Sequence, residues 1–206
     1  MLVRKMTTVT SVDKIVLASG STGRRGILEN IGLAFTVVTS DFDEASVERS
    51  STEELVQALA QAKARAVASA QEAALVIGSD NLVVIDDERL GKPEGEAGAT
   101  AMLERLGGRW HSIYNGMTVI NTATGAEATG FVVTKVKFRD LSEEEIAGYV
   151  ASGEPLDKAG AYGIQGKGAL LVERIEGDYY GIIGMSVVLL NQLAGQVEVK
   201  IGDWLY

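Results

Sequence analysis

Short apolar runs and segments with helical apolar spacing follow one another along the whole chain. Runs such as residues 14–19 and 75–78 are bounded by small or polar residues, which is typical of buried strands. Residues 110–121 and 130–138 alternate apolar and polar positions, which predicts two paired strands joined through ATGAEATG. The full set of expected strands is 14–19, 34–39, 75–78, 82–85, 110–121, 130–138, 169–175 and 182–184.

Five segments are expected to form helices, and two of them follow a capping residue. Ser51 or Thr52 caps a long helix whose apolar positions recur at helical spacing, and Ser142 with three following acids starts another. The first helix is expected to have Ile27 and Leu28 facing inward and to end at Gly32. The expected stripe of the long helix is Leu55, Leu59, Ala62 and Ala66. The expected helices are 24–32, 53–72, 95–106, 142–150 and 187–193. The mixture predicts an α/β fold without internal repeats.

Composition fits one domain with a sizeable core. The chain has 206 residues, of which 46% are hydrophobic and 23% charged. There are no cysteines, which excludes disulfides and zinc–thiolate sites, and a single histidine argues against a Ser–His–Asp triad. Residues 1–13 are expected to be an N-terminal extension without the apolar core of a signal peptide, and no membrane span is expected. The formal net charge of −9 disfavours nucleic acid as a partner.

Two strand ends carry candidate chemistry. The turn SGSTGRR, from Ser19 to Arg25, would expose main-chain N–H groups at a helix start, with arginines able to bind phosphate; an ordinary glycine–serine turn is the alternative. It lacks the Walker A spacing. Asp80 follows the apolar run LVI, where a carboxylate would point into a ligand crevice, hold a metal or deprotonate water, unless it only forms a turn.

Two later segments lie outside regular structure. Lys92 precedes one of only two prolines, and this proline restrains the Lys92 backbone and could hold its side chain in one pose. A solvated lysine at the exit of a hairpin explains the same sequence equally well. Residues 154–168 hold four glycines and two lysines and fit neither helix nor strand, as in a binding loop. Within this loop, Gln165 offers a donor and an acceptor suited to a nucleobase edge.

Four further residues are ambiguous when considered alone. Asp43 and Glu44 follow each other in an acidic loop and could complete a Mg²⁺ site with Asp80, although the local sequence alone favours a solvated acidic loop. Lys63 has the features of a surface lysine on a helix, and His111 is expected to cap or to pack beside Trp110.

The order of these segments resembles a known family. LASGSTGRR, the acidic loop, GSDNLVV, LGKP, FRDLSEEEI and EPLDKAGAYGIQG are similar in sequence and order to the Maf proteins, the septum-formation inhibitor-like nucleotide pyrophosphatases, over residues 15–193. The resemblance implies a two-lobed α/β fold, with a mixed sheet flanked by helices around a deep cleft as in inosine triphosphate pyrophosphatases, and a possible homodimer. It also implies a cytoplasmic enzyme that hydrolyses nucleoside triphosphates to the monophosphate and pyrophosphate with Mg²⁺ or Mn²⁺.

The resemblance assigns roles to residues of this chain. Asp80 would be the proton acceptor, with Lys63 and Lys92 also catalytic, and Asp80 with Glu44 would hold the metal. The residues expected to bind substrate are Ser19, Ser21, Arg24, Arg25 and Gln165.

The preferred base follows from a subgroup within the family. Gln165 in YGIQG resembles the dTTP/UTP subgroup, but that subgroup usually carries Arg at Gly23 and Thr at Asn81, so these positions are expected to influence base selection. The alternatives are a pyrophosphatase for a modified nucleotide such as 7-methyl-GTP, and a non-catalytic nucleotide-binding regulator of cell division.

Overall fold

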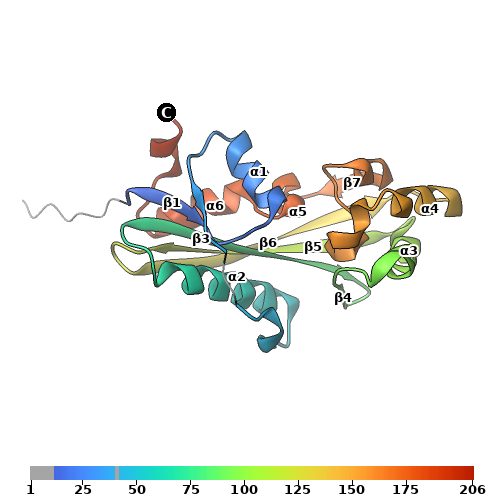
Figure 1. The fold of residues 1–206 in the computed structure, drawn as a ribbon, viewed down its shortest axis with the longest axis horizontal. Helices are drawn as coiled ribbons and strands as arrows, with labels where there is room; N and C mark the ends of the chain where they lie inside the picture. The colour runs from blue at the N-terminus through green and yellow to red at the C-terminus, as the bar shows by residue number, and fades with distance from the viewer. Residues whose placement is uncertain (1–11, 40–41) are drawn as a thin grey trace, which may run out of the picture.

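A seven-stranded mixed sheet forms the centre of the computed structural model, which describes residues 12–39 and 42–206 (Figure 1). The expected N-terminal extension lies outside the described residues up to position 11, as do residues 40–41 of the acidic loop. The main path of the sheet is β2-β1-β3-β5-β6-β7, and β4 pairs with β3. β1 is parallel to both β2 and β3, and the other pairs are antiparallel. The strands are β1 (Lys14–Leu17), β2 (Thr36–Val37), β3 (Ala74–Ile85), β4 (Glu88–Leu90), β5 (Trp110–Asn121), β6 (Ala126–Phe138) and β7 (Val172–Glu176).

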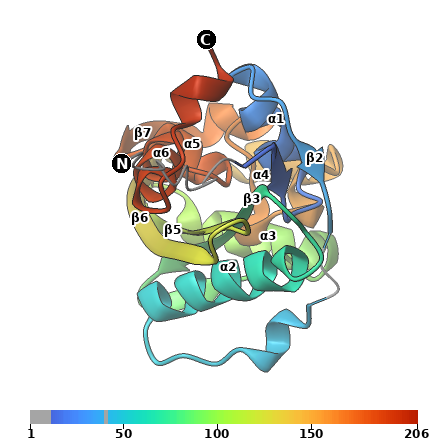
Figure 2. The same cartoon turned by 90° about the vertical axis from the view of Figure 1, so that its left-hand side faces the viewer.

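Helices cover both faces of this sheet. α2 lies along one face, while α1, α5 and α6 lie on the opposite face (Figures 1 and 2). α3 and α4 pack together at the far end of the molecule. The helices are α1 (Thr22–Asn30), α2 (Thr52–Ala68), α3 (Gly95–Leu106), α4 (Glu143–Ala151), α5 (Tyr179–Ile183) and α6 (Val187–Gln196). Short 3₁₀ helices are η1 (Glu44–Ser46), η2 (Glu154–Asp157), η3 (Ala159–Ala161), η4 (Lys167–Leu171) and η5 (Ile201–Trp204).

Three long strands, β3, β5 and β6, run through both halves of the molecule. At one end their apolar residues pack with α1 and α6, and at the other end with α3 and α4. Between these two cores, β3 carries Ser79, Asp80 and Asn81 in place of apolar residues. The expected mixed sheet flanked by helices is confirmed, and its polar middle lies between two separate hydrophobic clusters. That the whole chain forms one domain stays a prediction.

Two glycines allow α2 to lie unusually close to the sheet. A Cβ atom at Gly78 would come within 2.4 Å of the Ala60 carbonyl oxygen, and one at Gly116 within 2.3 Å of the Val56 carbonyl oxygen. Any larger residue would therefore force the helix outward. This close approach sets the height of Lys63, which lies on α2, above the middle of β3.

Several expected elements are shifted or wrong. Residues 182–184 were expected as a strand but close α5, because Asp178 caps this short helix by accepting a hydrogen bond from the Gly181 N–H. The strand expected at 169–175 begins only at residue 172, after η4. In α2, the helix ends at Ala68 instead of residue 72, and its buried stripe is shifted from the expected one. The buried residues of α2 are Val56, Leu59, Ala60, Lys63, Ala64 and Val67.

Other local expectations are confirmed. Ile27 and Leu28 face the core, and Gly32, at φ 78°, follows the end of α1. Ser142 and Glu145 form a full capping box. None of the helices in the described part of the chain combines the length and the apolar character that crossing a membrane requires.

Candidate functional site

A cleft of about 1320 Å³ opens over the polar middle of β3. Its walls come from the β1–α1 turn, from β3, from the segment after β4, from residues 154–166 and from α5. The expected site residues that line it are Ser19, Ser21, Gly23, Arg24, Glu44, Lys63, Asp80, Asn81, Lys92 and Gln165. The fold therefore gathers into one cavity residues that are separated by up to 146 positions in the sequence.

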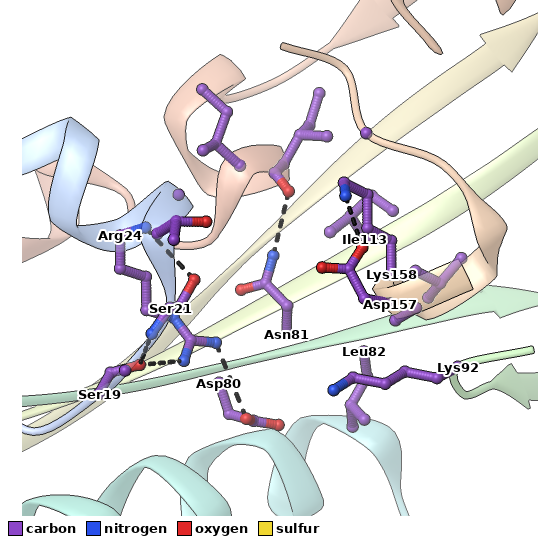
Figure 3. A pocket seen from close by; sticks show the side chains of 18 of the residues that line it. Ser19, Ser21, Arg24, Asp80, Asn81, Leu82, Lys92, Ile113, Asp157 and Lys158 are labelled. Atoms are coloured by element: carbon purple, nitrogen blue, oxygen red, sulfur yellow. Dashed lines mark hydrogen bonds and ion pairs between the residues drawn. The ribbon is translucent and has the colours of Figure 1, made fainter. Parts of the chain in front are cut away.

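The β1–α1 turn forms one end of the cleft (Figure 3). Ser21 caps α1 by accepting a hydrogen bond from the Arg24 N–H. The Ser19 hydroxyl accepts from the Ser21 N–H at 3.2 Å and from Arg24 Nη1 at 2.9 Å. The first turn of α1 thus presents main-chain N–H groups together with a guanidinium, which is the arrangement that binds phosphate oxygens.

Arg24 is held from several sides. Its Nε donates to the Gly184 carbonyl at 3.1 Å, and its Nη2 lies 3.8 Å from Asp80 Oδ1. The side chain is only 11% exposed. Burial lowers the pKa of Arg24 below its ordinary value, and the negative charges of Asp80 and Glu44 oppose that shift. Asp80 and Glu44 therefore help Arg24 to keep its positive charge in the cleft.

Asp80 and Lys63 form a buried ion pair at the floor of the cleft. Lys63 Nζ lies 2.5 Å from Asp80 Oδ1 and 2.8 Å from Glu44 Oε1. The side chains of Lys63 and Asp80 are 11% and 9% exposed, whereas that of Glu44 is 58% exposed. Lys63 is therefore not the surface lysine that its place on a helix suggested. It faces Asp80 because Gly78 and Gly116 let α2 approach the sheet.

The opposite end of the cleft is formed by the loop after α4 and by Lys92. The Gly160 N–H donates to the Gly91 carbonyl at 3.0 Å, which ties this loop to the segment that carries Lys92. Glu154 organises the loop: its carboxylate accepts from the Tyr149 hydroxyl and from the N–H groups of Lys167 and Gly168. Burial acts to raise the pKa of Glu154, but these hydrogen bonds hold it below its ordinary value. Gln165 is exposed on this ordered loop.

Two expected residues have different surroundings from those anticipated. Arg25 lies outside the cleft, with its side chain 62% exposed and paired with Glu29 one helical turn away. The arginines at 24 and 25 diverge because successive residues of a helix point about 100° apart. Asn81 lines the cleft, but its Nδ2 donates to the Gly181 carbonyl at 2.8 Å and its Oδ1 accepts from Asn115. Any effect of Asn81 on the base would therefore act through the position of α5.

Some residues of the site were missed from the sequence. Asn115 and Gly184 hold Asn81 and Arg24 in place, yet neither lies in a motif with recognisable chemistry.

His111 packs edge-on against Phe138 and Tyr162, and its Nε2 lies 2.8 Å from the Tyr162 hydroxyl. The expectation that it packs is confirmed, although its neighbours are these two rings: Trp110 is 40% exposed on the other face of the strand.

Glu44 and Asp80, the carboxylates expected to hold a divalent cation, both line the cleft. In the described residues, no cluster of three or more His, Cys, Asp or Glu side chains surrounds one point. However, Glu44 and Asp80 both come within 2.8 Å of the same cationic nitrogen, on Lys63, so they approach one point from two elements. Magnesium commonly uses one or two carboxylates and completes its shell with water and substrate phosphates. The donor set fits such a cation.

The fold and the site together define an α/β protein whose cleft suits a polyphosphate ligand at the end formed by Ser19 and Arg24, beside a buried carboxylate. The chain belongs to the family of Maf-like proteins, whose sequence model matches residues 14–197.

Relatives within this family share almost half of the sequence. The dTTP/UTP pyrophosphatase of Moorella thermoacetica is 48% identical over 182 residues, which cover 88% of this chain and 94% of the relative. That of Dictyoglomus turgidum is 49% identical, with 87% and 94% covered. That of Clostridioides difficile is 44% identical, with 87% and 92% covered.

Proposed function

We propose that this protein is a nucleoside triphosphate pyrophosphatase that converts dTTP and UTP to the monophosphate and pyrophosphate. The observation that carries the proposal is the position of Asp80, which is buried in the cleft beside Lys63 and Arg24. The turn at Ser19, whose N–H groups suit phosphate oxygens, lines the same cleft. Relatives of 42–49% identity are named dTTP/UTP pyrophosphatase, which supports the same substrate class.

The triphosphate lies between the β1–α1 turn and Lys92 in this proposal. The N–H groups at the start of α1 and the guanidinium of Arg24 bind phosphate oxygens at one end. Lys63 and Lys92 approach from α2 and from the segment after β4 and offset negative charge as it moves onto the leaving pyrophosphate. This requires Lys63 to share its charge between Asp80 and the substrate.

Asp80 acts as the proton acceptor for the attacking water. As the water oxygen bonds to the α-phosphorus, the bond from that phosphorus to the oxygen bridging to the β-phosphorus breaks, and pyrophosphate leaves with the electron pair. The water proton passes to the Asp80 carboxylate. Burial of Asp80, at 7% exposure, keeps bulk water from competing for its oxygens.

Asp80 and Glu44 are the residues that would hold a divalent cation. When bound, Mg²⁺ or Mn²⁺ would offset the charge of the triphosphate and polarise the attacking water. Lys63 contacts both carboxylates, and Arg24 brings a second positive charge to within 3.8 Å of Asp80.

The base lies at the end of the cleft formed by residues 154–166. Gln165 is exposed there and offers the donor and the acceptor that the edge of uracil or thymine requires. Gly23 leaves little room for a larger side chain, because a Cβ atom would lie 3.2 Å from the Ile183 carbonyl oxygen. A pyrimidine is therefore bound without an arginine from position 23.

A nucleotide panel tests this proposal. Pyrophosphate release is measured with UTP, dTTP, CTP, GTP and 7-methyl-GTP in the presence of Mg²⁺ or Mn²⁺. We expect UTP and dTTP to have the highest kcat/KM, and Asp80→Asn to lose turnover while keeping the melting temperature within a few degrees. Faster turnover of 7-methyl-GTP than of UTP and dTTP would contradict the proposed substrate preference. Nucleotide-dependent stabilisation without pyrophosphate release would show a binding protein instead.

The location and assembly of the protein remain proposals. We place the enzyme in the cytoplasm, where its proposed substrates are made, and the lack of cysteines agrees with a reducing compartment. We also expect a homodimer, which light scattering on the purified protein would test.

A further inference from the structure

A buried polar network lies directly beneath the cleft and has no role in the steps described above. Ser79, Asn81 and Asn115 extend from the middle of β3 and β5, where Asn81 and Asn115 are opposite each other in the register. Ser79 and Asn115 are fully buried. Both donate hydrogen bonds to the main chain between α5 and α6. Buried polar groups need such partners, but apolar residues would fill this space at less cost.

The side-chain amide of Asn115 is fixed in one orientation. Its Oδ1 accepts from the Ser186 N–H at 2.9 Å, which an Nδ2 group in its place could not do. Its Nδ2 therefore faces Asn81 Oδ1 at 2.6 Å and the Gly184 carbonyl at 2.9 Å. One side chain thus joins β3 to two residues of the α5–α6 connection.

The Gly184 carbonyl is the point that this network shares with the cleft. It accepts from Asn115 Nδ2, from the Ser79 hydroxyl at 2.8 Å and from Arg24 Nε at 3.1 Å. Gly184 has a φ of 144°, and a Cβ atom there would lie 3.1 Å from Arg24 Cγ. The glycine lets the Arg24 side chain pass directly over the main chain and lets the carbonyl turn towards its Nε.

The position of this carbonyl determines the plane of the Arg24 guanidinium. Nε is bound to Gly184 and Nη1 to Ser19, so two points fix the planar group. The remaining N–H groups are directed into the cleft, where Nη2 approaches Asp80 (Figure 3). A guanidinium binds phosphate in a fork geometry, so a rotation of its plane would misalign both of its hydrogen bonds.

We propose that Asn115 is a positioning residue that orients Arg24 for the triphosphate through the Gly184 carbonyl. The proposal rests on the proposed function, because it assigns Arg24 to the phosphates. Asn115 itself touches no reacting atom. It acts by holding the α5–α6 connection at a fixed height above β3 and β5.

A double-mutant cycle with Arg24 tests this role. Asn115→Ala removes the hydrogen bonds to Asn81, Gly184 and Ser186, and the loss of the bond to Gly184 should lower kcat/KM for UTP by about tenfold. In the Arg24→Ala background the same change should have less than about a twofold effect, because its target is gone. Inorganic tripolyphosphate, which lacks a base, should bind about tenfold more weakly to Asn115→Ala in calorimetry.

Asn121 offers a matched control on the same strand. It is also fully buried, and its Nδ2 donates to the Val197 carbonyl at 3.1 Å, but it lies six residues from Asn115, away from the cleft. Asn121→Ala should lose stability as Asn115→Ala does, yet keep the wild-type kcat/KM and tripolyphosphate affinity. This separates orientation of Arg24 from a general weakening of the fold.

Two results would overturn the proposal. One is an equal effect of Asn115→Ala with and without Arg24, and the other is wild-type kcat/KM in a folded Asn115→Ala protein. If that variant does not fold, Asn115→Ser is taken through the same cycle with the same criteria. A wild-type protein that releases no pyrophosphate would contradict the proposed function instead, while tripolyphosphate binding would still decide whether Asn115 acts through Arg24.

Discussion

Gly78→Ala should damage the site without touching any of its side chains. The added Cβ would lie 2.4 Å from the Ala60 carbonyl oxygen, 2.7 Å from the Ala64 nitrogen and 2.8 Å from the Ala64 Cβ. These atoms belong to the main chain or first carbon of α2, so no flexible side chain can move aside. Ordinary contact begins near 3.4 Å, and α2 must therefore move outward by about 1 Å.

This displacement acts directly on Lys63, which lies between Ala60 and Ala64. A movement of about 1 Å would lengthen the 2.5 Å contact from Lys63 Nζ to Asp80 to roughly 3.5 Å, beyond a good hydrogen bond. Overpacking typically costs about 1–3 kcal/mol. The loss of glycine flexibility in the unfolded chain returns about 0.4–1 kcal/mol. We expect a net loss of about 1–2 kcal/mol and a melting temperature lower by about 2–8 °C.

The assay combines thermal unfolding with steady-state pyrophosphate release from UTP. An error of about 1 Å in a catalytic group can reduce turnover by about 100-fold, so we expect kcat to fall by between 10- and 100-fold. Gly148→Ala is the control: this exposed position in α4 has open space around a new Cβ, and alanine should stabilise the helix by about 0.5–1 kcal/mol. Unchanged stability and activity in Gly78→Ala would refute the close packing of α2.

Three further predictions concern residues around the cleft. Arg24→Ala should lower kcat/KM for UTP at least tenfold, whereas Arg25→Ala should leave it unchanged, because only Arg24 faces the cleft. Glu154→Gln should raise KM several-fold with a smaller change in kcat, because one amide oxygen cannot replace two carboxylate oxygens in ordering the Gln165 loop; equal KM values would contradict this. Burial lowers the pKa of His111 from its ordinary 6.5 to about 4. Between pH 4 and pH 6.5, His111 therefore binds a proton in the unfolded chain but not in the folded chain. The free energy of unfolding should therefore fall by up to about 3 kcal/mol as pH drops from 6.5 to 4, and urea titrations should show a smaller fall in His111→Gln.

Much of the local structure could be predicted from the sequence because its causes are local. The capping box at Ser142, the end of α1 at Gly32 and the alternation in β5 each depend on residues within one or two turns. The prediction of a strand at 182–184 was wrong because so short an apolar segment does not distinguish a strand from a helix. The N-cap at Asp178, four residues before it, makes this segment the end of α5. The shifted stripe of α2 has a similar cause, since alanines are compatible with either face.

The candidate site was predicted in part, and only with the help of family resemblance. Asp80 and the turn at Ser19 carry their own signal, since both follow apolar runs in the sequence. The expectation that Asp80 lies at the end of a strand was wrong, because β3 continues through it to Ile85. Lys63 and Glu44 carry none: a lysine on a helix and a glutamate in a loop are ordinary surface residues until the fold places them beside Asp80.

The sequence by itself therefore determined the α/β class, most of the elements and Asp80 as the candidate central carboxylate, because these follow from short-range periodicity and from motifs. Only the tertiary structure decided which arginine faces the cleft, that Lys63 is buried, and that Asn115 reaches Arg24 through the Gly184 carbonyl. Each of these depends on contacts between segments that are far apart in the chain. Such contacts are set by how closely α2 and the α5–α6 connection pack against the sheet, and no local pattern records that distance.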